Sequence, residues 1–211
     1  MGKKYTQPKL GTVACIGANV KQKGLAPGFR HIVECLLSGN WKASGAALPP
    51  QDALLCQEFT APGASTMSEQ PLKEVFPCGG YTLTRVATRY VAVWTTWSVV
   101  SSWASEDGRT IAVLATDASA DATRTCWFLS SYLPTLSAGG HSIELYTQAC
   151  QQLGRLCERI RRSGTTAVGS VDTNTHVPLG DLLQGRDVSA MYPYQVPQAG
   201  HKRQVTALAL T

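Results

Sequence analysis

The sequence contains no run of about 18 apolar residues, the length that a membrane-spanning helix requires. Its lysine-rich start, Met-Gly-Lys-Lys-Tyr-Thr-Gln-Pro, is not followed by the apolar stretch of a secretory signal. None of the seven cysteines has a second cysteine at the Cys-x-x-Cys spacing of zinc and redox sites. These absences predict a protein with reduced cysteines that is neither secreted nor membrane-bound, in the cytoplasm or the nucleus.

The chain has 211 residues, of which 44% are hydrophobic, and this favours one domain with a substantial core. Its formal net charge is +5. A basic balance of this size is compatible with a polyanionic partner and equally with an ordinary, mildly basic protein. Charge alone therefore does not establish a nucleic-acid-binding function.

The first part of the chain predicts a strand, a helix and a second strand. Residues 12–20 form a short apolar run with β-branched residues, as in a buried strand. Apolar residues recur at helical spacing over residues 29–37, and a second apolar run covers residues 52–58. This order is typical of a βαβ unit, which would place Asn19 and Glu58 at the same end of adjacent strands.

The middle of the chain predicts a loop followed by antiparallel strands. Residues 60–80 contain Pro, Gly and Ser in a pattern typical of loops. Four strand-like segments follow, separated by turn residues, and predict hairpins. These segments are 81–86, 90–97, 110–117 and 124–132.

The last part of the chain contains its longest periodic segment. Residues 142–163 place apolar side chains on one face and predict a helix. Residues 165–171 predict a buried strand, and residues 205–211 a last edge strand. The predicted fold class is therefore α/β, a sandwich of mixed and antiparallel β-sheets flanked by helices.

Polar residues suited to phosphodiester cleavage lie where predicted strands end. Glu58 and Tyr132 each close a strand, and Asp172 and Asn174 follow a third. Open α/β scaffolds present ligand-binding groups at such ends. Cleavage requires a cation on the phosphoryl oxygens, a group that orients water, and donors for the developing charge. Each segment alone is more often structural, because Asp-x-Asn is also turn chemistry, but their joint order favours a shared site.

In this order the segments resemble the motifs of the endonuclease/exonuclease/phosphatase superfamily. They are the first strand with Asn19, then Asp-Ala-Leu-Leu-Cys-Gln-Glu58, Ser-Ser-Tyr132-Leu-Pro-Thr and Val-Asp172-Thr-Asn174-Thr-His. The resemblance is nearest to LINE-type retrotransposon and apurinic-site endonucleases. It implies the four-layer fold of that superfamily over residues 11–178, after an N-terminal tail, 1–10, and before a shortened or divergent segment, 179–211.

The resemblance implies a metal-dependent phosphodiesterase, most closely a DNA endonuclease that uses a metal-activated water. Glu58 is expected to bind Mg²⁺, or Mn²⁺ in its place, with Asn19 helping to form the metal site. Asp172 is expected to orient the water, Asn174 to donate to a phosphoryl oxygen, and Tyr132 to hydrogen-bond the phosphate. The implied partner is nucleic acid, DNA in the first place, bound by a monomer away from membranes.

Basic residues and histidines in the last segment add to these expectations. Lys202 and Arg203 are candidate phosphate contacts. His176 and His201 are expected to be solvated surface residues. A phosphate contact by Lys202 and Arg203 would extend the site beyond the four motifs.

Two features depart from the superfamily pattern. Val171 and Thr173 replace the glycine and the aromatic residue of the Gly-Asp-aromatic-Asn motif, and no Ser-Asp-His follows Asn174. The expected activity is therefore severely reduced or absent, as in a chain truncated at its C-terminal end. Two alternatives to a DNA endonuclease stay open. One is an inactive relic or nucleic-acid-binding module with the same fold, and the other is a phosphatase or RNA-directed member of the superfamily.

Overall fold

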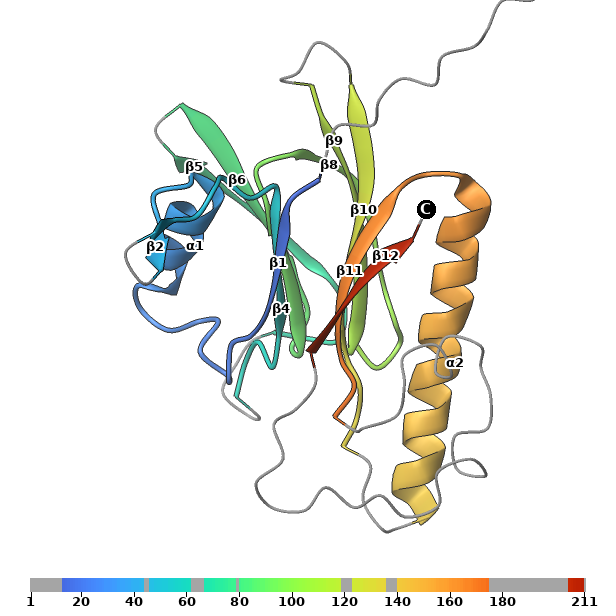
Figure 1. Ribbon diagram of the computed structural model, residues 1–211. Coiled ribbons are helices and arrows are strands. Elements are labelled where there is room, and N and C mark those ends of the chain that lie inside the picture. Colours follow the sequence, from blue (N-terminus) through green and yellow to red (C-terminus); the bar gives the residue numbers. More distant parts are fainter. Residues whose placement is uncertain are drawn as a thin grey trace, which may run out of the picture.

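Two five-stranded β-sheets packed face to face form the centre of the molecule, and one helix covers the outer face of each sheet (Figure 1). The layers therefore follow the order helix, sheet, sheet, helix, which confirms the predicted α/β sandwich. The computed structural model describes residues 13–43, 46–61, 67–78, 80–118, 123–135, 140–174 and 205–210.

The strand order is β1-β4-β7-β6-β5 in the first sheet and β12-β11-β10-β9-β8 in the second. The strands of the first sheet are β1 (Cys15–Asn19), β4 (Ala53–Gln57), β5 (Leu72–Cys78), β6 (Tyr81–Ala87) and β7 (Val91–Thr95). Those of the second sheet are β8 (Ser98–Ala104), β9 (Thr110–Asp117), β10 (Arg124–Tyr132), β11 (Ala167–Asp172) and β12 (Val205–Leu210). The helices are α1 (Phe29–Leu37) and α2 (Gly140–Ser163), and a small sheet pairs β2 (Lys42–Ala43) with β3 (Ala46–Ala47).

Three apolar cores separate the layers. The helix α1 covers the first sheet through Val33, which is buried in one core with Trp94. The two sheets meet around Leu55 and Phe128. The helix α2 packs on the second sheet through Leu153. Burial of a large apolar side chain stabilises a fold by about 1.5–3 kcal/mol, so each interface contributes to holding the layers in place.

The first strand, α1 and β4 form the expected βαβ unit. The strands β1 and β4 pair in parallel, with Asn19 opposite Gln57. Glu58 directly follows β4, so its backbone lies at the same end of the first sheet as Asn19. The prediction that Asn19 and Glu58 end adjacent strands is confirmed.

The second sheet combines hairpins with one parallel pair. The strands β9 and β10 pair antiparallel, in agreement with a predicted hairpin. On its other side β9 pairs with β8 and not with the predicted segment 90–97, whose strand β7 lies in the first sheet. The strands β10 and β11 are parallel, with Tyr132 opposite Asp172. The helix α2 is the crossover between them, because a parallel pair requires a long connection. Tyr132 and Asp172 are thereby neighbours at one end of the second sheet.

The prediction of a loop over residues 60–80 is wrong in part, because β5 occupies Leu72–Cys78 and pairs antiparallel with β6. The sequence analysis also missed β8, β2 and β3. The predicted helix 142–163 begins two residues earlier, at Gly140. The β5 strand lies at the sheet edge, where Pro77 is tolerated because a strand there is paired on one side only.

The strand β12 pairs antiparallel with β11 at the edge of the second sheet, as the prediction of a last edge strand required. The division of the chain at residues 11 and 178 stays a prediction. Neither helix in the described part of the chain has both the length and the apolar character needed to cross a membrane.

Candidate active site

Two side-chain hydrogen bonds join the two sheets at one end. Asn19 Nδ2 from β1 donates to Asp172 Oδ2 from β11 over 2.7 Å. The Tyr132 hydroxyl from β10 donates to Glu58 Oε1, just beyond β4, over 3.1 Å. Each bond links residues that are distant in sequence and lie in different sheets. Four of the five predicted site residues therefore meet at one end of the sandwich.

The Asp172 carboxylate is fully buried and accepts hydrogen bonds at both oxygens. Its Oδ1 accepts the backbone N–H of Asn174 over 3.0 Å, while Oδ2 accepts the Asn19 amide. Burial raises the pKa of Asp172 above its ordinary value, and the donors from Asn174 and Asn19 oppose part of that rise. A carboxylate with a raised pKa is a better proton acceptor, which suits a group that activates water.

The backbone is strained around these residues. Positive φ angles outside glycine occur at Lys21 (48°), Gln22 (65°), Glu58 (50°) and Asn174 (51°) among the described residues. All four follow a strand that ends at the site. Such conformations cost about 1–3 kcal/mol each and persist where the surrounding structure imposes them. Their grouping at one sheet end favours a functional site there.

Asn174, the fifth predicted residue, is fixed close to the Asp172 carboxylate. Its Nδ2 donates to the Leu133 carbonyl over 2.6 Å, and the residue is 5% exposed. Its Oδ1 is buried without a hydrogen-bond partner among the described residues. The buried Tyr146 hydroxyl donates to the Thr173 carbonyl over 3.1 Å, which fixes the same turn to α2. The Asp172-Thr-Asn174 segment is thus anchored from both sides.

Buried hydrogen bonds between the two sheets support the site. Gln57 is 0% exposed, and its Nε2 donates to Ser130 Oγ across the sheet interface over 2.9 Å. The Ser130 hydroxyl donates in turn to the Cys56 carbonyl over 2.8 Å. Gln57 directly precedes Glu58, and Ser130 lies two positions before Tyr132. This contact therefore fixes the spacing of the two strands that carry the Glu58–Tyr132 pair.

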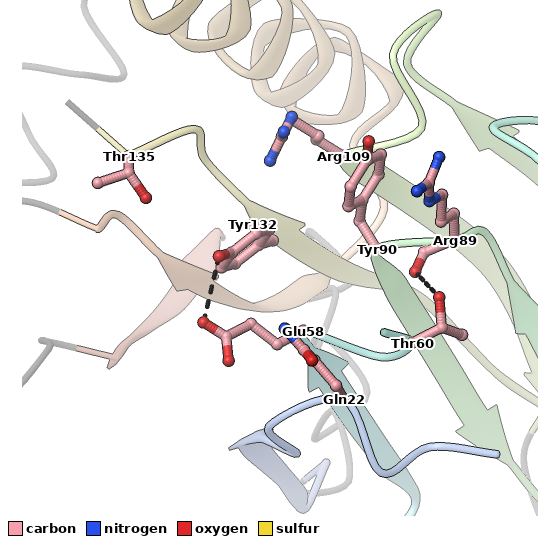
Figure 2. A pocket seen from close by; sticks show the side chains of 8 residues that line it. All are labelled: Gln22, Glu58, Thr60, Arg89, Tyr90, Arg109, Tyr132 and Thr135. Carbon is pink, nitrogen blue, oxygen red and sulfur yellow. Dashed lines mark hydrogen bonds between the residues drawn. The ribbon is translucent and has the colours of Figure 1, made fainter. Parts of the chain in front are cut away.

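A pocket of about 170 Å³ opens beside Glu58 and Tyr132 (Figure 2). Two arginines line it, Arg89 from the β6–β7 turn and Arg109 from the β8–β9 turn. The guanidinium carbon of Arg109 lies 4.3 Å from the centre of the Tyr90 ring. The pocket lining is completed by Gln22, Thr60 and Thr135. Two cations and two phenols around one carboxylate suit an anionic ligand bound together with a metal ion.

The donor set near Glu58 fits Mg²⁺, an ion that keeps several waters and uses one or two carboxylates plus substrate phosphate. Among the described residues no group of three or more His, Cys, Asp or Glu could hold a metal ion, so an all-protein cage is not formed there. The Oδ1 of Asn19 accepts the Lys21 N–H over 3.0 Å, while its Nδ2 is used by Asp172. The metal role of Asn19 therefore stays a prediction that depends on the second lone pair of Oδ1.

The structure brings Asn19, Glu58, Tyr132, Asp172 and Asn174 together, while their chemical roles stay predictions. Lys202, Arg203, His176 and His201 lie outside the described residues.

The sequence analysis did not assign the pocket arginines or Tyr90 to the site. Arg109 follows Gly108 in the turn before β9, and Arg89 and Tyr90 form the short turn between β6 and β7. A basic residue in a turn is common, so Arg89 and its neighbour Tyr90 carried no distinctive signal.

No protein-family model and no curated protein matches the chain. Among solved structures, its fold is similar to that of an AP endonuclease from Archaeoglobus fulgidus, at 15% identity and a TM-score of 0.49, over 94% of this chain and 87% of that one. It is also similar to the Xenopus laevis APE2 catalytic domain, at 12% identity and a TM-score of 0.48, over 83% of this chain and 65% of that one.

A third similar structure is a humanized D. rerio TDP2 with 14 mutations, at 13% identity and a TM-score of 0.42, over 81% of this chain and 66% of that one. The chain thus spans about two thirds of the TDP2 structure. The likeness to these structures is one of fold. The functional argument rests on the site residues of this chain.

Proposed function

We propose that the chain hydrolyses phosphodiester bonds of nucleic acid, DNA in the first place, in a reaction that depends on Mg²⁺. The observation that carries the proposal is the pair of cross-sheet hydrogen bonds, Asn19 to Asp172 and Tyr132 to Glu58. The two bonds lie at one end of the sheets and involve the buried Asp172 carboxylate and the Glu58 carboxylate, which lines a pocket with Arg109. With a bound metal ion, this combination would provide the cation, a group that orients water and donors for the developing charge.

Each residue has a defined task in this proposal. Glu58 holds Mg²⁺, or Mn²⁺ in its place, which neutralises charge on the phosphoryl oxygens when bound. Asp172 orients the attacking water and takes its proton, and Asn19 keeps the carboxylate in place. Tyr132 and Arg109 donate to the phosphate as charge develops on it.

Asn174 is proposed to donate to a phosphoryl oxygen. One amide hydrogen is committed to the Leu133 carbonyl, over 2.6 Å, so this donation uses the second hydrogen of Nδ2. The N–H of the same residue holds Asp172 Oδ1. Asn174 would thus couple the position of the phosphate to that of the carboxylate.

A second candidate function is a nucleic-acid-binding module that uses the same pocket without hydrolysis. The observation that favours it is the complete burial of Asp172, whose two oxygens both accept protein N–H groups. A water that is to be activated must displace or share one of these contacts. Both candidate functions predict binding of nucleic acid, but hydrolysis is predicted by the first alone.

Nicking of supercoiled plasmid distinguishes them. The full chain is incubated with plasmid in Mg²⁺, Mn²⁺ or EDTA, together with Glu58→Gln and Asp172→Asn. Metal-dependent nicking that falls at least about 100-fold in both variants supports the hydrolase. The matched control is Glu144→Gln, which removes an exposed carboxylate from α2.

Metal binding is measured separately from hydrolysis, through the thermal stability of the chain. Mn²⁺ is expected to raise the unfolding midpoint of the wild-type chain, because a ligand of the folded state stabilises it. The rise should be lost in Glu58→Gln and kept in Glu144→Gln. A folded wild-type chain that binds plasmid but does not nick it in either metal contradicts the hydrolase and supports the binding module.

A further inference from the structure

Tyr132, Arg109, Tyr90 and Arg89 form an alternating row of phenol rings and guanidinium groups, here called the arginine–tyrosine row. The Arg109 guanidinium carbon lies 5.6 Å from the centre of the Tyr132 ring and 4.3 Å from that of Tyr90. The Arg89 guanidinium carbon lies 5.7 Å from the centre of the Tyr90 ring. Figure 2 shows Tyr90 between the two arginines. The row begins at the partner of Glu58 and ends at Arg89.

The backbone around Arg89 is fixed by three hydrogen bonds. The Arg89 N–H donates to the Ser68 carbonyl over 2.9 Å, and the buried Thr60 hydroxyl donates to the Arg89 carbonyl over 2.7 Å. The Thr88 hydroxyl donates to the Gly108 carbonyl over 2.5 Å, which ties the β6–β7 turn to the turn that carries Arg109. Both guanidinium groups therefore extend from positioned backbone, and less entropy is lost when they bind a ligand.

We propose that Arg89 binds the phosphate group next to the scissile one, so that the site takes a polynucleotide and not a small phosphate ester. This rests on the proposed function, which places the scissile phosphate at Glu58 and Tyr132. Arginine presents a planar fork of donors that matches phosphate oxygens. A small ester held at Glu58 and Tyr132 is expected to engage Arg109, which lies against the Tyr132 ring, in preference to Arg89, which lies against the Tyr90 ring.

The dimensions of the row agree with this assignment. The two guanidinium carbons are no more than 10 Å apart, as their distances to the shared Tyr90 ring require. Successive phosphates on one strand of a duplex are about 3.4 Å apart along the helix axis and farther apart through space, and a guanidinium spacing below this upper limit is compatible with contacts to neighbouring phosphates of one strand. Tyr90, between them, offers an aromatic face to a base or sugar.

The test compares Arg89→Gln with Arg162→Gln. The second variant removes the same charge from an exposed position on α2, where Arg162 pairs with Glu158. Binding of a labelled single-stranded oligonucleotide is measured in EDTA over a range of salt concentrations. Hydrolysis of that oligonucleotide and of bis(p-nitrophenyl) phosphate, which has no second phosphate group, is measured in Mg²⁺.

We expect Arg89→Gln to weaken oligonucleotide binding about three- to tenfold and to reduce the slope of log affinity against log salt by about 0.7. The loss of kcat/KM should be at least about threefold greater for the oligonucleotide than for the small diester. Arg162→Gln should change neither quantity by more than about twofold.

Equal losses on both esters would place Arg89 on the scissile phosphate and overturn the proposal. Binding and salt slope equal to wild type would also overturn it, because then Arg89 contacts no phosphate. The binding measurement in EDTA does not require hydrolysis. A chain that binds through Arg89 and cleaves neither substrate therefore contradicts the proposed hydrolysis while supporting the phosphate contact.

Discussion

A buried carboxylate such as Asp172 is held in place at an energetic cost. Its charge is removed from water, and among the described residues two N–H donors, from Asn19 and Asn174, compensate for the lost solvation. Proteins keep such groups where the chemistry needs them, so the cost itself points to function. The free-energy cost of burying this charge depends on pH, and unfolding of the chain without metal measures that dependence.

The unfolding free energy of the wild-type chain is expected to fall, relative to Asp172→Asn, as pH rises from about 3.5 to 7. Burial raises the pKa of Asp172 in the folded state, with the donors from Asn174 and Asn19 opposing part of the rise. The folded chain therefore binds the proton more tightly than the unfolded chain. Below the unfolded pKa both states are protonated and no penalty exists; above the folded pKa the penalty is complete.

Urea unfolding in EDTA at several pH values measures this difference. The substitution also alters the hydrogen bonds to Asn19 and Asn174. This changes the unfolding free energy of the variant by an amount that does not depend on the protonation of Asp172. Only the change with pH is therefore diagnostic. Glu144→Gln, at an exposed position, is the control for the removal of a carboxylate. A difference between wild type and Asp172→Asn that stays flat across the range would contradict the buried-charge account.

At the scale of single residues, the sequence predicted the five motif residues and missed their surroundings. Glu58 and Asp172 could be found because each follows an apolar run, and strand ends of one sheet meet in space. Gln57 and Arg109 could not be assigned, because their contacts join positions far apart in the chain. Gln57 reaches Ser130, and Arg109 reaches Tyr90, only once both sheets have formed.

The two turns that carry the pocket arginines act as one structural element. Thr88 joins them through the Gly108 carbonyl. Gly108 has a φ of +67°, and a Cβ there would lie 2.7 Å from the Cα of Glu69. Both the conformation and the close approach require glycine. The position of Arg109 therefore depends on a residue that has no side chain.

Gly108→Ala is expected to destabilise the fold more than Gly164→Ala. The φ angles are nearly equal, +67° and +66°, so both variants incur the left-handed strain of about 1–2 kcal/mol. Only at Gly108 does the new Cβ meet backbone, whereas the space around Gly164 is open. Crowding of this kind adds about 1–3 kcal/mol. Urea unfolding of both variants measures the difference, and equal losses would mean that the turn shifts freely away from Glu69.

The error in predicting β5 has a physical cause at the level of the element. Its residues are mostly exposed or half-buried, and Leu72 and Val75 are 47% and 55% exposed. An edge strand of this kind lacks the apolar run that identified β4, whose five residues are all buried. It forms because β6 offers it a hydrogen-bonding partner. Such pairing is a property of the hairpin and not of the local sequence.

At the scale of the whole molecule, the four layers could be predicted from the order of elements, whereas the position of β12 beside β11 depends on pairing after a long separation in sequence.

Each apolar interface between the layers contains at least one buried thiol. Cys56 lies in the core beneath α1, and Cys126 in the core between the sheets. Cys150 and Cys157 lie in the core beneath α2. Thiol chemistry can therefore report on all three interfaces.

The folded chain is expected to react rapidly with a thiol reagent at two of its seven cysteines, Cys35 and Cys78, both of which are only half-buried free thiols. Burial raises the pKa of Cys126 and Cys157 to about 11 and that of Cys150 to about 12. It also raises the pKa of Cys56. The half-buried Cys15 is protected because burial first, and then the charges of Cys126 and Asp52, raise its pKa to about 12.

The thiolate is the reactive form, so a raised pKa and a covered sulfur both slow the reaction. Labelling with 5,5′-dithiobis(2-nitrobenzoate) near pH 8, followed by mass spectrometry of peptides, identifies the fast sites. Cys35→Ser and Cys78→Ser should each remove one fast equivalent, and urea should expose the remainder. Fast labelling of Cys150 or Cys157 in the absence of urea would show that α2 separates from the second sheet, and the crossover that places Asp172 beside Tyr132 would then be mobile.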